Sequence, residues 1–252
     1  MSLDFDSARL PNKNLSPEHH EWRAQLRRFI DREIMPYAED WDESGSIPDE
    51  LWIKSAEIGL LGMGYHEEFG GVTEGIDLWH GIILNEEMAR VAVGGVAETL
   101  LVHGIGLPPV INFGSDEVKQ MVAPPVLAGI KRISLAITEP GGGSDVAQLQ
   151  TTARLDGDHY VVNGSKTYIT GGMNADWFTT AVRTGGEGSG GVSTLLVPAD
   201  AEGVSRTALN RKQGWWCSDT ATIYFDNVRV PRGNLLGQEN KGFAVIMNNF
   251  NS

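Results

Sequence analysis

The chain has 252 residues, and 33 acidic against 20 basic side chains give a formal net charge of -13 at pH 7. This acidic balance argues against nucleic-acid and membrane partners, and an anionic ligand would need a local binding site. The single cysteine, Cys217, excludes an internal disulfide and suits a reducing compartment. The N-terminus carries Asp4 and Asp6 without an apolar core, unlike a signal peptide, and no apolar run reaches the roughly 18 residues of a membrane span. We therefore expect a cytoplasmic protein of bacterial type, or as the alternative a matrix protein whose transit peptide is absent from this sequence.

The first half of the chain predicts helices. Ser16 and Pro17 suit the N-cap and the first helical position, and an apolar face at helical spacing follows from Trp22 to Ile34. Pro36 is expected to bend or end this helix. Further helices are expected at about 48–62, 76–93 and 96–102, with Gly94 and Gly95 as the break between the last two, and from the N-cap Ser115 to the residue before Pro124.

After Lys131 the period of the apolar residues changes from about 3.6 to about 2, which indicates strands. Asp156-Gly157 and Asn163-Gly164 have the composition of two-residue hairpin turns. The expected strands are 133–137, 151–155, 159–162, 166–170, 177–183, 192–197 and 220–225. The prediction is an α+β multidomain protein, with an N-terminal α-helical domain over residues 1–129 and an antiparallel β-barrel or sandwich domain over residues 130–236.

The last segment, residues 237–252, predicts the start of a C-terminal helical bundle. Phe243, Ile246, Met247 and Phe250 follow one another at helical spacing and form an apolar face. The sequence contains no later segment on which this face could pack. This pattern suggests a C-terminally truncated protein.

The segment from Thr138 to Asp145 is the strongest chemical signal. It follows an apolar strand, and its three consecutive glycines, 141–143, expose backbone N–H groups that an anion can approach closely. The glycines with Ser144 would by themselves also fit a flexible loop. Because they follow the ordered sequence Thr138-Glu139-Pro140, a binding loop is favoured. They open no helix of a βαβ unit, so this is not a Rossmann fingerprint.

These eight residues, TEPGGGSD, resemble the signature of the acyl-CoA dehydrogenases, which are flavoproteins that desaturate acyl-CoA thioesters. Three further blocks resemble the same family in order and spacing: 168–177, 214–231 and 234–243. The resemblance extends from about Trp22 to the last residue. It implies a helical domain, a β domain and a four-helix bundle, of which this chain has the first two and only the opening of the third.

The resemblance also implies an FAD site. The implied cofactor-binding residues are Leu135, Ile137, Thr138, Gly143, Ser144, Tyr168, Ile169 and Thr170. Thr138 would hydrogen-bond the isoalloxazine ring, Thr170 would lie near its N5, and Tyr168 could pack against its face. Ser144 would reach the pyrophosphate and also neighbour the thioester substrate. The flavin supplies the redox chemistry, and the protein orients it.

In the family, a glutamate of the C-terminal bundle removes the α-proton as hydride passes from Cβ to flavin N5. We assign no catalytic base within this chain and expect the 252 residues alone to be inactive. Glu86 and Glu87 are expected on a solvated helix face, and Glu139 in a structural role. Cys217 is expected to be a packing residue. The histidines at 19, 20, 66, 80, 103 and 159 show no ligand spacing, so capping or surface roles are predicted and no metal site.

The function that the resemblance implies is an FAD-dependent acyl-CoA dehydrogenase of fatty acid or branched acyl catabolism. Its partners would be an acyl-CoA substrate and an electron-transfer flavoprotein, and the full-length protein would form a homodimer or homotetramer. Two alternatives stay open. One is a related flavin enzyme, such as an acyl-CoA oxidase or flavin monooxygenase, and the other is a non-catalytic binding or oligomerisation fragment.

Overall fold

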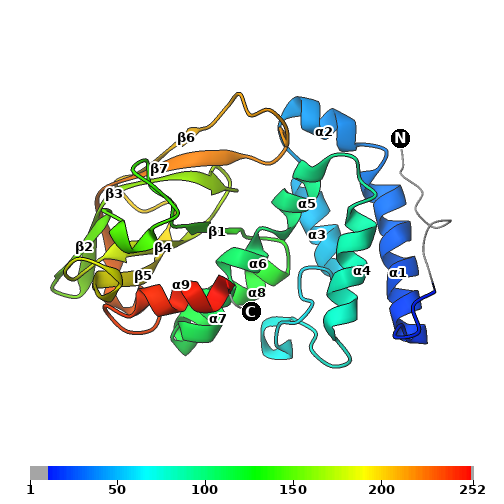
Figure 1. Ribbon diagram of the computed structural model, residues 1–252, viewed down its shortest axis with the longest axis horizontal. Coiled ribbons are helices and arrows are strands. Elements are labelled where there is room, and N and C mark those ends of the chain that lie inside the picture. The colour runs from blue at the N-terminus through cyan, green and yellow to red at the C-terminus, as the bar shows by residue number, and fades with distance from the viewer. Residues whose placement is uncertain (1–10, 251–252) are drawn as a thin grey trace. The chain divides into compact units, whose positions relative to one another are not determined.

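The computed structural model describes residues 11–250 (Figure 1). Its contacts divide the chain into two compact units. The first runs to Leu100 and includes the segment Lys212–Ser218, and the second comprises Leu101–Arg211 and the residues from Asp219 onward. The contacts group residues 101–129 with the strands, whereas the sequence-based boundary follows residue 129. The sequence-based domain limits stay predictions.

The first unit is helical. Its elements are α1 (Pro17–Phe29), the π-helical turn η2 (Ile30–Ile34), α2 (Ala38–Ser44), α3 (Asp49–Glu57), the short 3-10 helix η3 (Glu67–Phe69), α4 (Leu78–Met88) and α5 (Gly94–Leu101). Ser16 caps α1 as predicted, and Pro17 is its first residue. Leu26, Ile30 and Ile34 are fully buried, so the predicted apolar face of this helix is confirmed.

The predicted break between two helices exists but lies at residues 89–93, because α4 ends at Met88 and Gly94 and Gly95 already belong to α5. A Cβ on Gly94 would lie 2.7 Å from Trp215 Nε1, and one on Gly95 would lie 2.8 Å from Cys217 Sγ. The two glycines therefore let the segment 212–218 pack against the first turn of α5. Cys217 is buried there, and burial raises the pKa of its thiol to about 12, as expected of a packing residue.

The second unit contains the remaining elements. They are α6 (His103–Gly106), α7 (Pro108–Phe113), α8 (Asp116–Leu127), β1 (Ile133–Ala136), η4 (Val146–Gln148), β2 (Thr152–Asp156), β3 (His159–Thr170), β4 (Trp177–Arg183), η5 (Ser189–Gly191), β5 (Val192–Pro198), β6 (Val204–Ala208), β7 (Thr220–Pro231), η6 (Arg232–Asn234) and α9 (Gly242–Phe250). The sequence pattern did not reveal α6, α7 or β6. Ser115 caps α8 as predicted.

Helix α8 continues through Pro124 and Pro125 instead of ending before them. The two prolines lack N–H groups, but their carbonyls accept hydrogen bonds from Ala128 and Ile130 at 3.0 and 2.9 Å. The apolar face also continues across them, with Val126 buried beyond the prolines. Tertiary packing thus outweighs the local proline penalty.

The strands form one mixed sheet in the order β1-β4-β2-β3-β7-β6, with β5 paired to β4 (Figure 1). The pairs β2–β3, β3–β7, β4–β5 and β6–β7 are antiparallel, while β1–β4 and β2–β4 are parallel. A helical unit followed by a curled sheet agrees with the predicted fold class. The parallel pairs were not predicted, because alternation along a strand is the same in both pairings.

Asn163-Gly164 is a bulge and not a hairpin turn, which corrects the sequence-based prediction. Strand β3 runs through both residues, and its register against β7 shifts between Val162 and Gly164. Gly164 has φ of 143°, and a Cβ on it would lie 2.7 Å from Thr151 Cα. The other predicted turn, after Asp156, is confirmed, since β2 and β3 pair antiparallel across it.

No single helix within residues 11–250 has both the length and the apolar composition of a membrane span. One bent pair, Gly94–Leu101 with His103–Phe113, meets these two criteria when its members are taken together.

We expect Gly164→Ala to destabilise the protein more than Gly157→Ala does. Both glycines have positive φ, but nothing lies within 4 Å of a Cβ on Gly157, whereas one on Gly164 meets the backbone of Thr151. The overpacking should add about 1–3 kcal/mol to the loss at Gly164. Urea unfolding of the two variants measures the difference, and equal losses would contradict the steric explanation.

Candidate functional site

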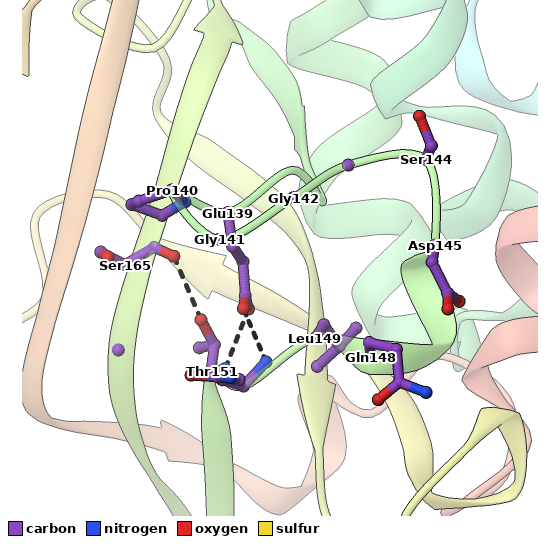
Figure 2. A pocket seen from close by; sticks show the side chains of 13 residues that line it. Glu139, Pro140, Gly141, Gly142, Ser144, Asp145, Gln148, Leu149, Thr151 and Ser165 are labelled. Atoms are coloured by element: carbon purple, nitrogen blue, oxygen red, sulfur yellow. Dashed lines mark hydrogen bonds between the residues drawn. The ribbon is translucent and has the colours of Figure 1, made fainter.

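The glycine-rich loop leaves the end of β1 and borders a groove of about 720 Å³ (Figure 2). The groove is lined by residues 139–145 and 148–151 and by Gly164 and Ser165. Glu139 and Gly142 exchange two backbone hydrogen bonds of 3.1 and 3.0 Å. Pro140 and Gly141 therefore form the corner of a tight turn, so this part of the loop is an ordered structure and not a flexible linker.

Glu139 and Lys166 form a buried ion pair beneath this loop. Lys166 on β3 is fully buried, and its Nζ lies 2.7 Å from Glu139 Oε1 and 3.0 Å from the carbonyl oxygen of Ile137. The Glu139 carboxylate also accepts the backbone N–H groups of Gln150 at 2.6 Å and Thr151 at 2.8 Å, as the dashed lines of Figure 2 show. The pair thus ties the segment after β1 to β3 and to the two residues that precede β2.

The pKa values of Lys166 and Glu139 are both lowered, but for different reasons. Burial lowers the pKa of Lys166 to about 8, although the Glu139 charge partly offsets the shift. Burial raises the pKa of Glu139, but the Lys166 charge and the hydrogen bonds from Lys166, Thr151 and Gln150 outweigh it, so the pKa lies below its usual range. Glu139 is therefore an ionised structural anchor at neutral pH. Its predicted structural role is confirmed.

Arg183 holds the segment that follows the glycine loop. Its guanidinium donates to the backbone carbonyls of Leu149 at 2.9 Å, Ala147 at 2.7 Å and Gly188 at 3.2 Å. These carbonyls belong to η4, to the residue that follows it and to the glycine-rich connection before β5. The contacts fix the side of the groove that Gln148 and Leu149 form.

Two of the predicted FAD residues, Thr138 and Gly143, pack together. A Cβ on Gly143 would lie 2.9 Å from Thr138 Cγ2, so the loop needs glycine at this position. The carbonyl of Thr138 accepts the N–H of Thr167 at 2.8 Å, which places the end of β1 beside the end of β3. Ser144 lines the groove and is exposed, with its side chain pointing away from Thr151 (Figure 2).

The predicted second wall lies on the last residues of β3. Tyr168 is 71% exposed and has φ of 57°, an uncommon backbone conformation for a residue other than glycine. Thr170 is half-buried and pairs with Thr220 on β7. Because Thr167 bonds to Thr138, the residues Tyr168 to Thr170 start next to the end of β1. Neither Thr138 nor this wall is among the residues that line the groove.

The remaining predicted residues are apolar and contribute to the core. Ile169 is buried in the main core of the sheet, and Ile137 is buried in a smaller cluster against which Leu135 packs. Because the side chains of the two isoleucines are buried, only their backbone groups are able to contact a ligand. The FAD assignments for all eight residues stay predictions.

The sequence analysis missed Lys166 and Arg183 and misjudged Glu87. Glu87 is fully buried and not on a solvated helix face, because α4 packs beside α1 and the arginines of α1 face it. Its carboxylate lies 3.0 Å from Arg23 Nη1 and 3.0 Å from Arg27 Nε. The side chain of Glu86 is 43% exposed, as expected. No periodic pattern distinguishes a lysine or glutamate that will be paired inside from one on the surface.

Comparison with known proteins places this fold and loop in one class. The sequence matches the family descriptions "Acyl-CoA dehydrogenase, N-terminal domain" over residues 16–130 and "Acyl-CoA dehydrogenase, middle domain" over residues 134–228. It is 38% identical to an acyl-CoA dehydrogenase of Alternaria alternata, over 96% of this chain and 59% of that protein. The chain belongs to the acyl-CoA dehydrogenase family.

Two solved structures illustrate the similarity. A probable acyl CoA dehydrogenase from Mycobacterium abscessus is 46% identical with a TM-score of 0.89, covering 93% of this chain and 62% of that one. An acyl-CoA dehydrogenase from Bacillus anthracis, complexed with FAD, is 34% identical with a TM-score of 0.86, covering 96% of this chain and 42% of that one. The chain thus spans less than two thirds of the length of these relatives.

We expect Glu139→Gln to cost about 3 kcal/mol of unfolding free energy at pH 7, because it leaves the buried Lys166 without a counter-charge. The glutamine oxygen can also accept fewer of the N–H groups that the carboxylate now accepts. Glu187→Gln in an exposed glycine-rich loop is the control and should change stability by less than about 0.5 kcal/mol. A loss at Glu139 no larger than the control loss would contradict the anchoring role.

The lowered pKa of Lys166 predicts a pH dependence of stability. Between pH 8 and 10.5 the unfolded state keeps the Lys166 proton while the folded state releases it, so the unfolded state binds more protons. The unfolding free energy should therefore rise with pH in this window, by on the order of 2 kcal/mol relative to Lys166→Met. Denaturant unfolding of both proteins across this range measures the difference, and parallel profiles would show that Lys166 has an ordinary pKa.

Proposed function

We propose that the protein containing this chain is an FAD-dependent acyl-CoA dehydrogenase that desaturates an acyl-CoA thioester between Cα and Cβ. The observation that carries the proposal is the TEPGGGSD loop, anchored at the end of β1 by Glu139 and Lys166, in a chain of the acyl-CoA dehydrogenase family. The complex of the Bacillus anthracis relative with FAD supports the choice of cofactor. FAD, when bound, supplies the two-electron acceptor of the reaction.

The residues present fit a flavin. The exposed ring of Tyr168 offers an aromatic face on which a planar ring can stack. Thr138 and Thr170 bring hydroxyl groups from the ends of β1 and β3, which the hydrogen bond from the Thr167 N–H to the Thr138 carbonyl holds together. No neighbouring group lies within 4 Å of a Cβ position on the exposed Gly141 or Gly142, so a phosphate can approach the loop closely, and Ser144 offers a hydroxyl to its oxygens. In this proposal Ser144 also borders the thioester substrate.

The proposal extends to the setting of the reaction. The substrate is an acyl-CoA of fatty acid or branched acyl catabolism, and an electron-transfer flavoprotein receives the electrons. The whole protein works as a homodimer or homotetramer in the cytoplasm. The base that removes the α-proton is supplied by sequence beyond these 252 residues, because the buried carboxylates of Glu87 and Glu139 are both held in ion pairs, the first with Arg23 and Arg27 and the second with Lys166.

The test uses the protein expressed with whatever coding sequence follows Ser252. We expect it to purify with FAD and to be reduced anaerobically by at least one member of a panel of acyl-CoA thioesters, measured as bleaching of the flavin absorbance. Thr170→Val should slow this reduction by about 100-fold, since it removes one donor to the electron-accepting ring. Thr207→Val, at an exposed position of β6, is the control and should react normally. A protein that binds no flavin would contradict the proposal.

The 252-residue chain provides the paired measurement. We expect weak FAD binding and no dye-coupled turnover, because loss of a general base typically lowers the rate by about 10²–10⁴. Turnover within about tenfold of the longer protein would show that the base lies inside this sequence. Glu86, Glu87 and Glu139 would then be the residues to substitute.

A further inference from the structure

Two helix N-termini meet at a cluster of His19, Asp77 and His80 in the first unit. Helices α1 and α4 pack side by side (Figure 1), and a histidine occupies the third position of each. Asp77 is the N-cap of α4, and its Oδ1 lies 2.9 Å from His19 Nε2 and 3.0 Å from His80 Nδ1. The two imidazole rings are 4.5 Å apart between centroids. Three ligand atoms from two helices thus converge on one point.

The hydrogen bonds fix the state of His19 in the absence of a metal. Its Nδ1 accepts the backbone N–H of Ser16 at 2.9 Å, so Nε2 carries the proton and donates it to Asp77. His80 Nδ1 faces both the backbone N–H of Asp77 at 3.2 Å and the Asp77 carboxylate at 3.0 Å. One nitrogen cannot accept from the first and donate to the second. If it accepts, two electron-rich atoms face each other without a proton between them.

We propose that His19 Nε2, Asp77 Oδ1 and His80 Nδ1 bind a divalent transition-metal ion, with Zn²⁺ as the best match. Two imidazoles and one carboxylate form a donor set that Zn²⁺ uses in proteins. The three atoms lie within 4.8 Å of one another. Tetrahedral zinc with bonds of about 2.0–2.1 Å separates its ligand atoms by about 3.3 Å, so the two distances from Asp77 Oδ1 to the histidine nitrogens need to lengthen by only a few tenths of an ångström.

The surroundings supply an orienting contact and an entry path. With zinc on Nε2, the His19 proton moves to Nδ1, which gives up the hydrogen bond from the Ser16 N–H and can donate instead to the Ser16 hydroxyl oxygen, 3.1 Å away. The two histidine side chains are 7% and 10% exposed, whereas that of Asp77 is 51% exposed, so the metal enters and keeps its fourth ligand, a water, on the Asp77 side. The helix dipoles oppose a cation here, and the Asp77 carboxylate offsets this repulsion.

The consequence is a metal clamp between the first turns of α1 and α4. Binding to the folded state alone would raise the thermal stability of the chain. Neither flavin nor turnover is needed to observe it. The sequence offered no sign of this cluster, because Asp77 and His80 lie about 60 positions from His19 and only the packing of the two helices brings them together.

The test is a Zn²⁺ titration of the untagged 252-residue chain by calorimetry, with thermal unfolding measured in parallel. The informative variants keep the helix caps: Gln at positions 19 and 80 preserves a capping box, and Asn at position 77 preserves an N-cap. We expect one Zn²⁺ per chain with micromolar affinity. His19→Gln, Asp77→Asn and His80→Gln should each weaken it at least tenfold, while the exposed His20→Gln should bind like the wild type.

Saturating Zn²⁺ should raise the melting temperature of the wild type and of His20→Gln by about 5 °C or more, and at the same concentration should raise that of the three ligand variants by clearly less. Histidine ring signals in NMR spectra of the wild type provide a measurement that does not depend on how the variants fold. His19 and His80 should shift on Zn²⁺ addition and His20 should not. The absence of saturable binding below about 1 mM, or equal affinity in all variants, would overturn the proposal.

Discussion

The buried ion pair between Glu139 and Lys166 is the contact on which the surroundings of the glycine loop depend. The carboxylate also accepts the N–H groups of the two residues before β2, and the ammonium also donates to the carbonyl of Ile137, the residue after β1. The partners come from segments up to 29 positions apart, and Lys166 lies in the middle of β3. An unpaired charge at this depth costs several kcal/mol. The three segments therefore keep one relative arrangement, and the loop leaves the sheet in one direction.

Such anchoring explains how a run of glycines can serve as a binding surface. Glycine loses more conformational entropy on ordering than any other residue, so a free GGGS segment would be disordered. Here the turn between Glu139 and Gly142 holds the first part, the contact with Thr138 requires glycine at 143, and Arg183 holds the segment that follows. The exposed backbone is thus ordered before any ligand arrives, which reduces the entropy cost of binding.

The helical unit uses polar groups at its helix contacts in a related way. Glu87 of α4 is fully buried yet bonded to two arginines of α1, and the first turns of the same helices meet through His19, Asp77 and His80. Both sets of contacts join positions about 60 residues apart. They specify how α1 and α4 pack, since an apolar face by itself tolerates several registers. The proposed metal clamp would add to a contact that the protein already makes with hydrogen bonds.

The sequence by itself determined the features that depend on neighbouring residues. These include the capped start of α1, its apolar face, the change to strands after Lys131, and the glycine-loop motif that identifies the family. Only the tertiary structure decided that Asn163-Gly164 is a bulge, that α8 continues through two prolines, that β4 pairs in parallel with β1, and that Glu87 and Lys166 are buried. The physical reason is the distance along the chain over which each interaction acts. Spacing and capping act within a few residues, whereas register, strand direction and the burial of a charge depend on partners that the fold brings from far along the chain.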